Sequence, residues 1–129
     1  MKDGIVDVRS QHSVVATIDR LEAKARAAGM AVFARIDFSG DAARTGMAMR
    51  PMQALLFGNP RAGTPILAAA PHAGLDLPLR ALAWEDASGA VWISSNTPDY
   101  VGQRHDVPEP LLGPLRGARG LIEAAAATD

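Results

Sequence analysis

The chain has 129 residues, with 13 basic residues, 14 acidic residues and no cysteine. This length fits one domain, the near-neutral charge gives no attraction to nucleic-acid backbones, and the lack of cysteine excludes disulfides, thiolate catalysis and cysteine-bound zinc. No apolar stretch approaches the roughly 18 residues of a membrane helix, and residues 1–9 do not begin a signal peptide, so we expect a soluble cytoplasmic protein without a membrane partner.

The first half of the chain predicts a strand, a helix and two further strands. Residues 5–9 alternate roughly between apolar and polar side chains, as a half-buried strand does. Ser13 stands at the position of an N-cap, and apolar residues recur on one face of the predicted helix that follows as far as Gly29. Residues 30–38 and 52–58 are rich in apolar side chains and predict the next two strands.

The second half contains the clearest hairpin signal. Residues 79–86 and 91–96 have strand character and enclose the turn sequence Ala-Ser-Gly-Ala. A turn at this place would make Trp84 and Trp92 cross-strand neighbours. Asp86, the last residue of the first arm, is expected to accept hydrogen bonds from the turn.

Three further helices are predicted. One runs from Thr64, with a proline at its first position, through alanines to Pro71. Another runs from a Thr97 cap to His105. The last follows Pro114 and carries on one face the apolar residues Leu115, Ala118, Ile122 and Ala125. About five strands, three or four helices and a hairpin predict a single α+β domain spanning all 129 residues, with a mostly antiparallel sheet and helices packed on one face.

Four segments carry a resemblance to a known family. They are FARID (residues 33–37), LLFGNPRAGTP (55–65), LDLPLRALAWED (75–86) and SNTPDYVGQRH (95–105). Together they span residues 33–105, and this stretch resembles the domain of unknown function 302 family of bacterial and archaeal proteins. The resemblance implies a compact α+β fold and a homodimer, and it supplies no reaction. The family often has histidine where this chain has Phe38 and tyrosine where it has Ser95, so no role is carried over for either group.

The glycine-rich turn after the strand 52–58 is the first candidate site. A helix N-terminus with free backbone N–H groups favours anions, and Arg61 would add a charge-assisted contact. The spacing is not that of a P-loop. The alternative is that Gly58, Asn59 and the following proline only shape a tight turn capped by Thr64.

The preferred functional hypothesis is a homodimeric binding domain for a small, anionic metabolite. The residues predicted to contact this ligand are Gly58, Asn59, Arg61, Thr64, Asp76, Trp84 and Asn96. No cofactor is expected. A structural or interaction subunit without any ligand is a further alternative, because no established catalytic motif is present.

An enzyme is the second hypothesis, and the residues leave this question open. Glu85 or Asp37 would be the general acid or base. The residues that would orient the substrate are Arg35, Asn96, Arg104 and His105. A structural ion pair of Glu85 with Arg35 or Arg104 is the favoured reading, since burial would otherwise raise the pKa of this carboxyl.

No metal site is expected. His12, His72 and His105 are far apart in the sequence and lack the spacing of metal ligands. The methionines at 47, 49 and 52 are expected to fill irregular gaps in the core or in an interface.

Overall fold

Five strands form one antiparallel sheet in the order β1-β5-β4-β3-β2. The computed structural model describes residues 4–128, so the first three residues of the segment 1–9 lie outside the described part. The strands are Ile5–Ser10 (β1), Ala31–Asp37 (β2), Met52–Gly58 (β3), Leu79–Glu85 (β4) and Val91–Asn96 (β5). All five predicted strands are confirmed to within one or two residues.

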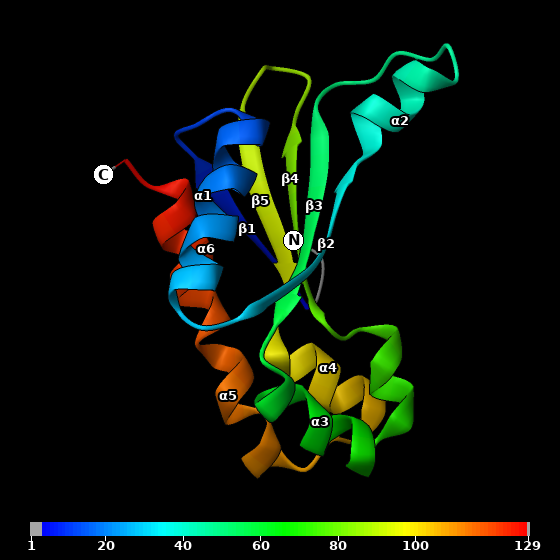
Figure 1. Ribbon diagram of the computed structural model, residues 1–129, viewed down its shortest axis with the longest axis vertical. Helices are drawn as coiled ribbons and strands as arrows, with labels where there is room; N and C mark the ends of the chain where they lie inside the picture. Colours follow the sequence, from blue (N-terminus) through cyan, green and yellow to red (C-terminus); the bar gives the residue numbers. More distant parts are fainter. Residues whose placement is uncertain (1–3, 129) are drawn as a thin grey trace.

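Two helices, α1 and α6, lie on one face of the sheet, α3, α4 and α5 lie at one of its ends, and α2 projects at the opposite end (Figure 1). Their bounds are Val14–Ala27 (α1), Phe38–Arg44 (α2), Pro60–Ala69 (α3), Pro98–His105 (α4), Gly113–Arg116 (α5) and Ala118–Ala126 (α6), with 3₁₀ turns at Pro71–Leu75 (η1) and Glu109–Leu111 (η2). None of these helices is long and apolar enough to cross a bilayer within residues 4–128.

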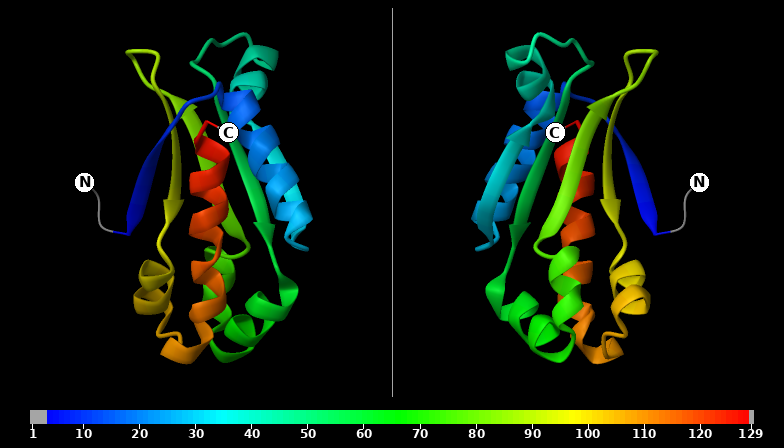
Figure 2. Two further views of the ribbon diagram at one scale, coloured as in Figure 1. Left: turned by 90° about the vertical axis from the view of Figure 1, so that its left-hand side faces the viewer. Right: turned by 90° about the vertical axis from the view of Figure 1, so that its right-hand side faces the viewer.

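The core lies between the sheet and the helices α1 and α6, which run side by side (Figure 2). Ile18 and Leu21 of α1 and Ile122 of α6 pack against Leu55 and Ile93 of the sheet, and all five side chains are buried. Burying one such side chain contributes about 1.5–3 kcal/mol. The predicted α+β class, with helices on one face of the sheet, is confirmed.

The other face of the sheet is open. The right-hand panel of Figure 2 shows the strands in front of α6, with no helix before their central part. Trp84 lies opposite Met52 on one side and Trp92 on the other, and Leu82 lies opposite Ala54. Because side chains alternate along a strand, these residues point away from the core face. We call this surface the open face.

The start of α3 differs from the prediction. The helix begins at Pro60, and the side chain of Asn59 accepts a hydrogen bond from the N–H of Arg61 at its N-terminus. The predicted start and cap at Thr64 is therefore wrong. Asn59 followed by proline is itself a cap with proline at the first helical position, a pair that starts a helix as well as stopping a strand.

For the predicted C-terminal helix, the buried face is confirmed, but the prediction of one continuous helix is wrong. The side chains predicted to face the core are buried: Leu115, Ala118, Ile122 and Ala125. The predicted single helix is divided at Gly117 into α5 and α6.

The prediction that the methionines fill gaps in the core is wrong for Met47 and Met49, whereas Met52 of β3 is half-buried. Met47 is 69% exposed and Met49 is also exposed, in the segment that follows the projecting α2 (Figure 1). Their predicted role in an interface stays a prediction.

Candidate functional site

A cavity of about 290 Å³ opens where β3 ends and α3 begins. Asn59, Gly63 and Thr64 border it from α3, and Leu77 and Pro78 border it from the segment that precedes β4. Among residues 4–128, no charged residue belongs to its wall. We call it the large cavity to distinguish it from a smaller one beside it; two hollows elsewhere on the surface, which are more open, have volumes of about 410 and 310 Å³.

The mouth of the large cavity carries apolar side chains in contact with water. Phe33 is 55% exposed, and Leu67 of α3 is exposed as well. Both belong to the cavity wall. Exposed apolar groups that gather at a hollow mark binding surfaces more often than scattered ones do. An apolar occupant would cover both side chains.

The first turn of α3 offers an anion little. Pro60 has no N–H, and the N–H of Arg61 donates to Asn59 Oδ1 at 2.9 Å. The N–H groups of Ala62 and Gly63 both donate to the carbonyl oxygen of Asn59 at 2.9 Å. The side chain of Arg61 is exposed, and Arg61 is not part of the cavity wall. The predicted anionic ligand stays a prediction, and these contacts do not support it.

A smaller cavity of about 50 Å³ lies next to the large one. Leu79 and Leu115 belong to the walls of both. The small cavity differs in having charged residues in its wall, namely Asp76, Arg80 and Arg119. Ser95 and Asn96 also belong to its wall. Its volume fits a few water molecules and no larger ligand.

Asp76, predicted to contact a ligand, binds Arg104 and His105, which were predicted to orient a substrate. Its Oδ2 accepts a hydrogen bond from Arg104 Nη1 at 2.9 Å and lies 2.6 Å from His105 Nε2. The side chains of His105 and Asp76 are only 4% and 11% exposed. Nothing in the sequence indicated this contact, because Asp76 is in a loop and its two partners are at the end of α4.

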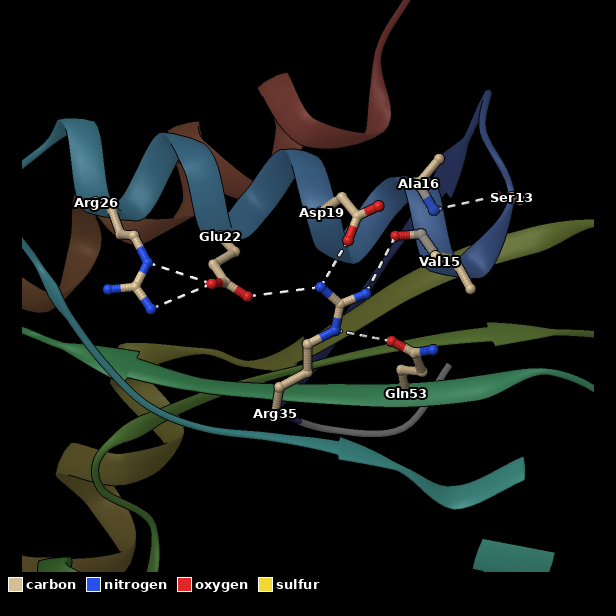
Figure 3. Close-up of polar contacts among 8 residues, drawn as sticks. All are labelled: Ser13, Val15, Ala16, Asp19, Glu22, Arg26, Arg35 and Gln53. Atoms are coloured by element: carbon tan, nitrogen blue, oxygen red, sulfur yellow. Dashed lines mark hydrogen bonds and ion pairs between the residues drawn. The ribbon is translucent and has the colours of Figure 1, made fainter. Parts of the chain in front are cut away.

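Arg35 belongs to a different network, between β2 and α1 (Figure 3). Its Nη1 lies 2.6 Å from Asp19 Oδ1 and 3.5 Å from Glu22 Oε1. Its Nε donates to Gln53 Oε1 at 3.0 Å, and its Nη2 donates to the carbonyl oxygen of Val15. The contacts of Nη1 and Nη2 thus hold the edge strand β2 against α1, and the Nε contact ties β2 to the neighbouring strand β3.

Of the two predicted acid or base residues, Asp37 forms hydrogen bonds that cap α2, and Glu85 forms no ion pair within residues 4–128. Asp37 Oδ1 accepts hydrogen bonds from the N–H of Gly40 at 2.9 Å and from Ser39 Oγ at 2.8 Å. The Gly40 bond first, and then the Ser39 bond, lower the pKa of Asp37. Within residues 4–128, Glu85 forms no ion pair. Its predicted pairing with Arg35 or Arg104 is wrong, because both guanidinium groups bind aspartates.

The strand register separates the enzyme candidates into two groups. Asp37 pairs with Gln53 and Glu85 pairs with Val91, all at the end of the sheet near α2. Asn96 lies at the other end, as do Arg104 and His105 on α4. The structure therefore does not gather the proposed acid or base with Asn96, Arg104 or His105. Arg35 lies two residues before Asp37 on β2, but its guanidinium binds Asp19 and Glu22 of α1.

Trp84, which was predicted to contact the ligand, and His12, for which no metal site was expected, both lie away from the two cavities. Trp84 is on the open face, and its Nε1 donates to Ser94 Oγ at 2.8 Å. His12 Nε2 lies 2.7 Å from the carbonyl oxygen of Ala127. In the described part of the chain, no three histidine, aspartate or glutamate side chains lie close enough to hold a metal ion.

Comparisons with known proteins agree with the fold. A family model described as "Domain of unknown function DUF302" matches residues 6–125. A crystal structure of an uncharacterised conserved DUF302 protein from Bacillus stearothermophilus has a TM-score of 0.82 at 17% identity, over 98% of this chain and all of that one.

This chain matches less than half of the length of two curated relatives. The chain is 47% identical over 104 residues to proteins named "Fluoride-specific ion channel FluC 1" from Brucella suis and Brucella abortus. The matched region is 81% of this chain and spans 41% and 38% of those proteins, respectively. On the match over residues 6–125, this chain belongs to the DUF302 family.

Proposed function

We propose that this chain is a homodimeric domain that binds a small, uncharged and largely apolar molecule in the large cavity. The observation that carries the proposal is the cavity itself, about 290 Å³ with an apolar wall and few polar groups. Ligand sites in proteins have this character, and this volume is near the small end of their range. A compact ligand is therefore favoured.

The composition of the wall is the reason for proposing a neutral ligand. A charged molecule would lose its hydration in the cavity without gaining a counter-charge. Asn59 Oδ1 is occupied by the N–H of Arg61, but the Nδ2 amide of Asn59 and the hydroxyl of Thr64 have no hydrogen-bond partner among residues 4–128. These two groups could bind a carbonyl, ether or hydroxyl group of the ligand.

The open face supports the homodimer. It presents two indole rings and Leu82 on a sheet surface without a helix before it (Figure 2). A second copy of the chain, related by a two-fold axis, would place the same surface against itself. Aromatic side chains are enriched at such interfaces.

Two helical glycines provide a matched test of the cavity. A Cβ atom added at Gly63 or at Gly120 would meet no other group within 4 Å, but only Gly63 belongs to the cavity wall. We expect Gly63→Leu to weaken binding of the uncharged fluorescent probe N-phenyl-1-naphthylamine by about tenfold or more, and Gly120→Leu to leave it unchanged. Equal affinities of the two variants would contradict the proposal. Neither change should unfold the chain, since glycine is a poor helix former.

The two curated relatives favour a second candidate function, an interaction module for a fluoride channel. A close relative of this sequence occupies about two-fifths of a protein named as such a channel. In this proposal the domain modulates fluoride transport by a channel of this kind. The test is fluoride efflux from vesicles carrying the Brucella suis protein without its matched 104 residues. A changed efflux rate on adding this chain would support the proposal, and an unchanged rate would contradict it.

A further inference from the structure

Three consecutive residues connect the two cavities. Asp76 belongs to the wall of the small cavity, whereas Leu77 and Pro78 belong to the wall of the large one. The position of Asp76 in the fold therefore bears directly on the shape of the large cavity. We call residues 76–78 the shared wall, because this one segment contributes residues to both cavities.

The shared wall is held at both of its ends. At the first end, the N–H groups of Asp76 and Leu77 both donate to the carbonyl oxygen of Ala73, at 2.9 and 3.0 Å. At the other end, Leu79 begins β4 and pairs with Phe57 of β3. The Asp76 side chain adds a third attachment, which reaches α4.

The third attachment joins one carboxylate oxygen to two partners. Oδ2 of Asp76 takes both the guanidinium of Arg104 and the ring nitrogen of His105. Hydrogen bonds to a charged group are shorter and stronger than neutral ones, and removal from water strengthens them further. The low exposure of His105 and Asp76 meets this second condition. We call the three residues the clamp.

We infer that the clamp positions the shared wall and thereby sets which ligand shapes the large cavity accepts. This inference rests on the proposed function. No residue of α4 borders the large cavity, and the side chains of Arg104 and His105 reach its wall through Asp76. They are positioning residues. A released wall would let Leu77 and Pro78 move, and the cavity would discriminate less between slim and bulky molecules.

The test measures shape selectivity rather than affinity alone. Displacement of N-phenyl-1-naphthylamine by 1-decanol and by 1-adamantanol gives the ratio of two affinities, one for a slim and one for a bulky alcohol. We expect this ratio to change by about threefold or more in Asp76→Asn and in His105→Gln. The matched controls are His72→Gln, an exposed histidine in η1, and Glu123→Gln, one partner of an exposed ion pair in α6. Both should keep the native ratio.

The outcomes separate this inference from the proposed function. If the affinities for both alcohols fall by the same factor, the ratio is unchanged. The clamp then only supports stability, and the inference is overturned while the binding function stands. If the native protein binds neither the probe nor the alcohols, the proposed function fails and the inference with it. Should Asp76→Asn not fold, Arg104→Gln removes a half-exposed partner at little cost to stability and is expected to shift the ratio in the same direction.

Discussion

Trp84 and Trp92 lie directly opposite each other on the β4–β5 ladder, and each has its own hydrogen-bond acceptor. Trp84 Nε1 donates to Ser94 Oγ at 2.8 Å, and Trp92 Nε1 donates to Asp86 Oδ2 at 2.9 Å. With both N–H groups satisfied inside the chain, the rings offer mainly apolar surface to a partner. The guanidinium of Arg9 lies 5.9 Å from the Trp92 ring, at the border of this surface.

The open face predicts the effect of one charge on assembly. Leu82 lies between β3 and β5 on this face, so Leu82→Glu would place a carboxylate in the proposed dimer interface. We expect sedimentation to show two chains for the native protein and one chain for this variant. Val15→Glu, which changes an exposed residue of α1 on the other side of the sheet, should remain a dimer. A native protein that sediments as one chain would contradict the homodimer.

Asp86 predicts a loss of stability in acid. Its carboxylate accepts four hydrogen bonds, from the N–H and hydroxyl of Ser88, the N–H of Ala90 and the indole of Trp92. The Ser88 hydroxyl, followed by the Trp92 indole, holds the pKa of Asp86 well below its ordinary value of 3.8. The stabilisation is present above pH 3.8 and is lost as the pH falls from there through the lowered pKa.

The measurement is the urea midpoint of the native protein and of Asp86→Asn at several pH values. We expect the variant to be less stable at neutral pH and the difference to narrow below pH 3.8. A difference that does not depend on pH would show that the charge of this group is not what stabilises the turn.

The Arg35 network predicts that replacing Arg35 lowers the free energy of unfolding and that a second substitution, at Gln53, recovers part of this loss. Gln53 is 8% exposed, and its Oε1 accepts from Arg35 Nε. Arg35→Met leaves this buried oxygen without its partner, which costs about 1–3 kcal/mol of unfolding free energy. Adding Gln53→Leu should recover part of the loss, whereas Arg26→Met, which breaks an exposed pair, should cost at most about 0.5 kcal/mol. Urea unfolding without recovery in the double variant would argue against this account.

The observed start of α3 predicts which residue caps it. Asn59→Ala removes the acceptor for the N–H of Arg61 and should lower the unfolding free energy by about 1 kcal/mol. Thr64→Val removes a hydroxyl that has no hydrogen bond within residues 4–128, so its effect should be smaller. Thermal unfolding without ligand compares the two, and a larger effect at Thr64 would contradict the assigned cap.

The local elements followed from the sequence because their signals are local. Alternation, the Ser13 cap and the hairpin turn each lie within a few residues of the element that they define. The start of α3 was missed because Asn59 with a following proline both ends a strand and begins a helix. Side-chain chemistry alone does not choose between the two.

The site was less predictable, because its contacts are distant in the chain. Asp76 meets His105 across 29 positions, and the large cavity combines residues from β2 to α5. The order of strands decides which residues meet, and no short segment encodes that order. The sequence singled out Asn59 and Asp76 as ligand contacts, which stays a prediction, and it could not show that they border different cavities.

The central claim is that the large cavity binds an uncharged apolar molecule, and a nuclear magnetic resonance titration tests it most directly. Correlation spectra of the nitrogen-15 labelled protein would be recorded with increasing N-phenyl-1-naphthylamine. The account predicts saturable shifts of the backbone amides of Gly58, Gly63 and Leu77, with the indole signals of Trp84 and Trp92 on the open face unchanged. Shifts confined to the indole signals, or the absence of any saturable shift, would contradict it.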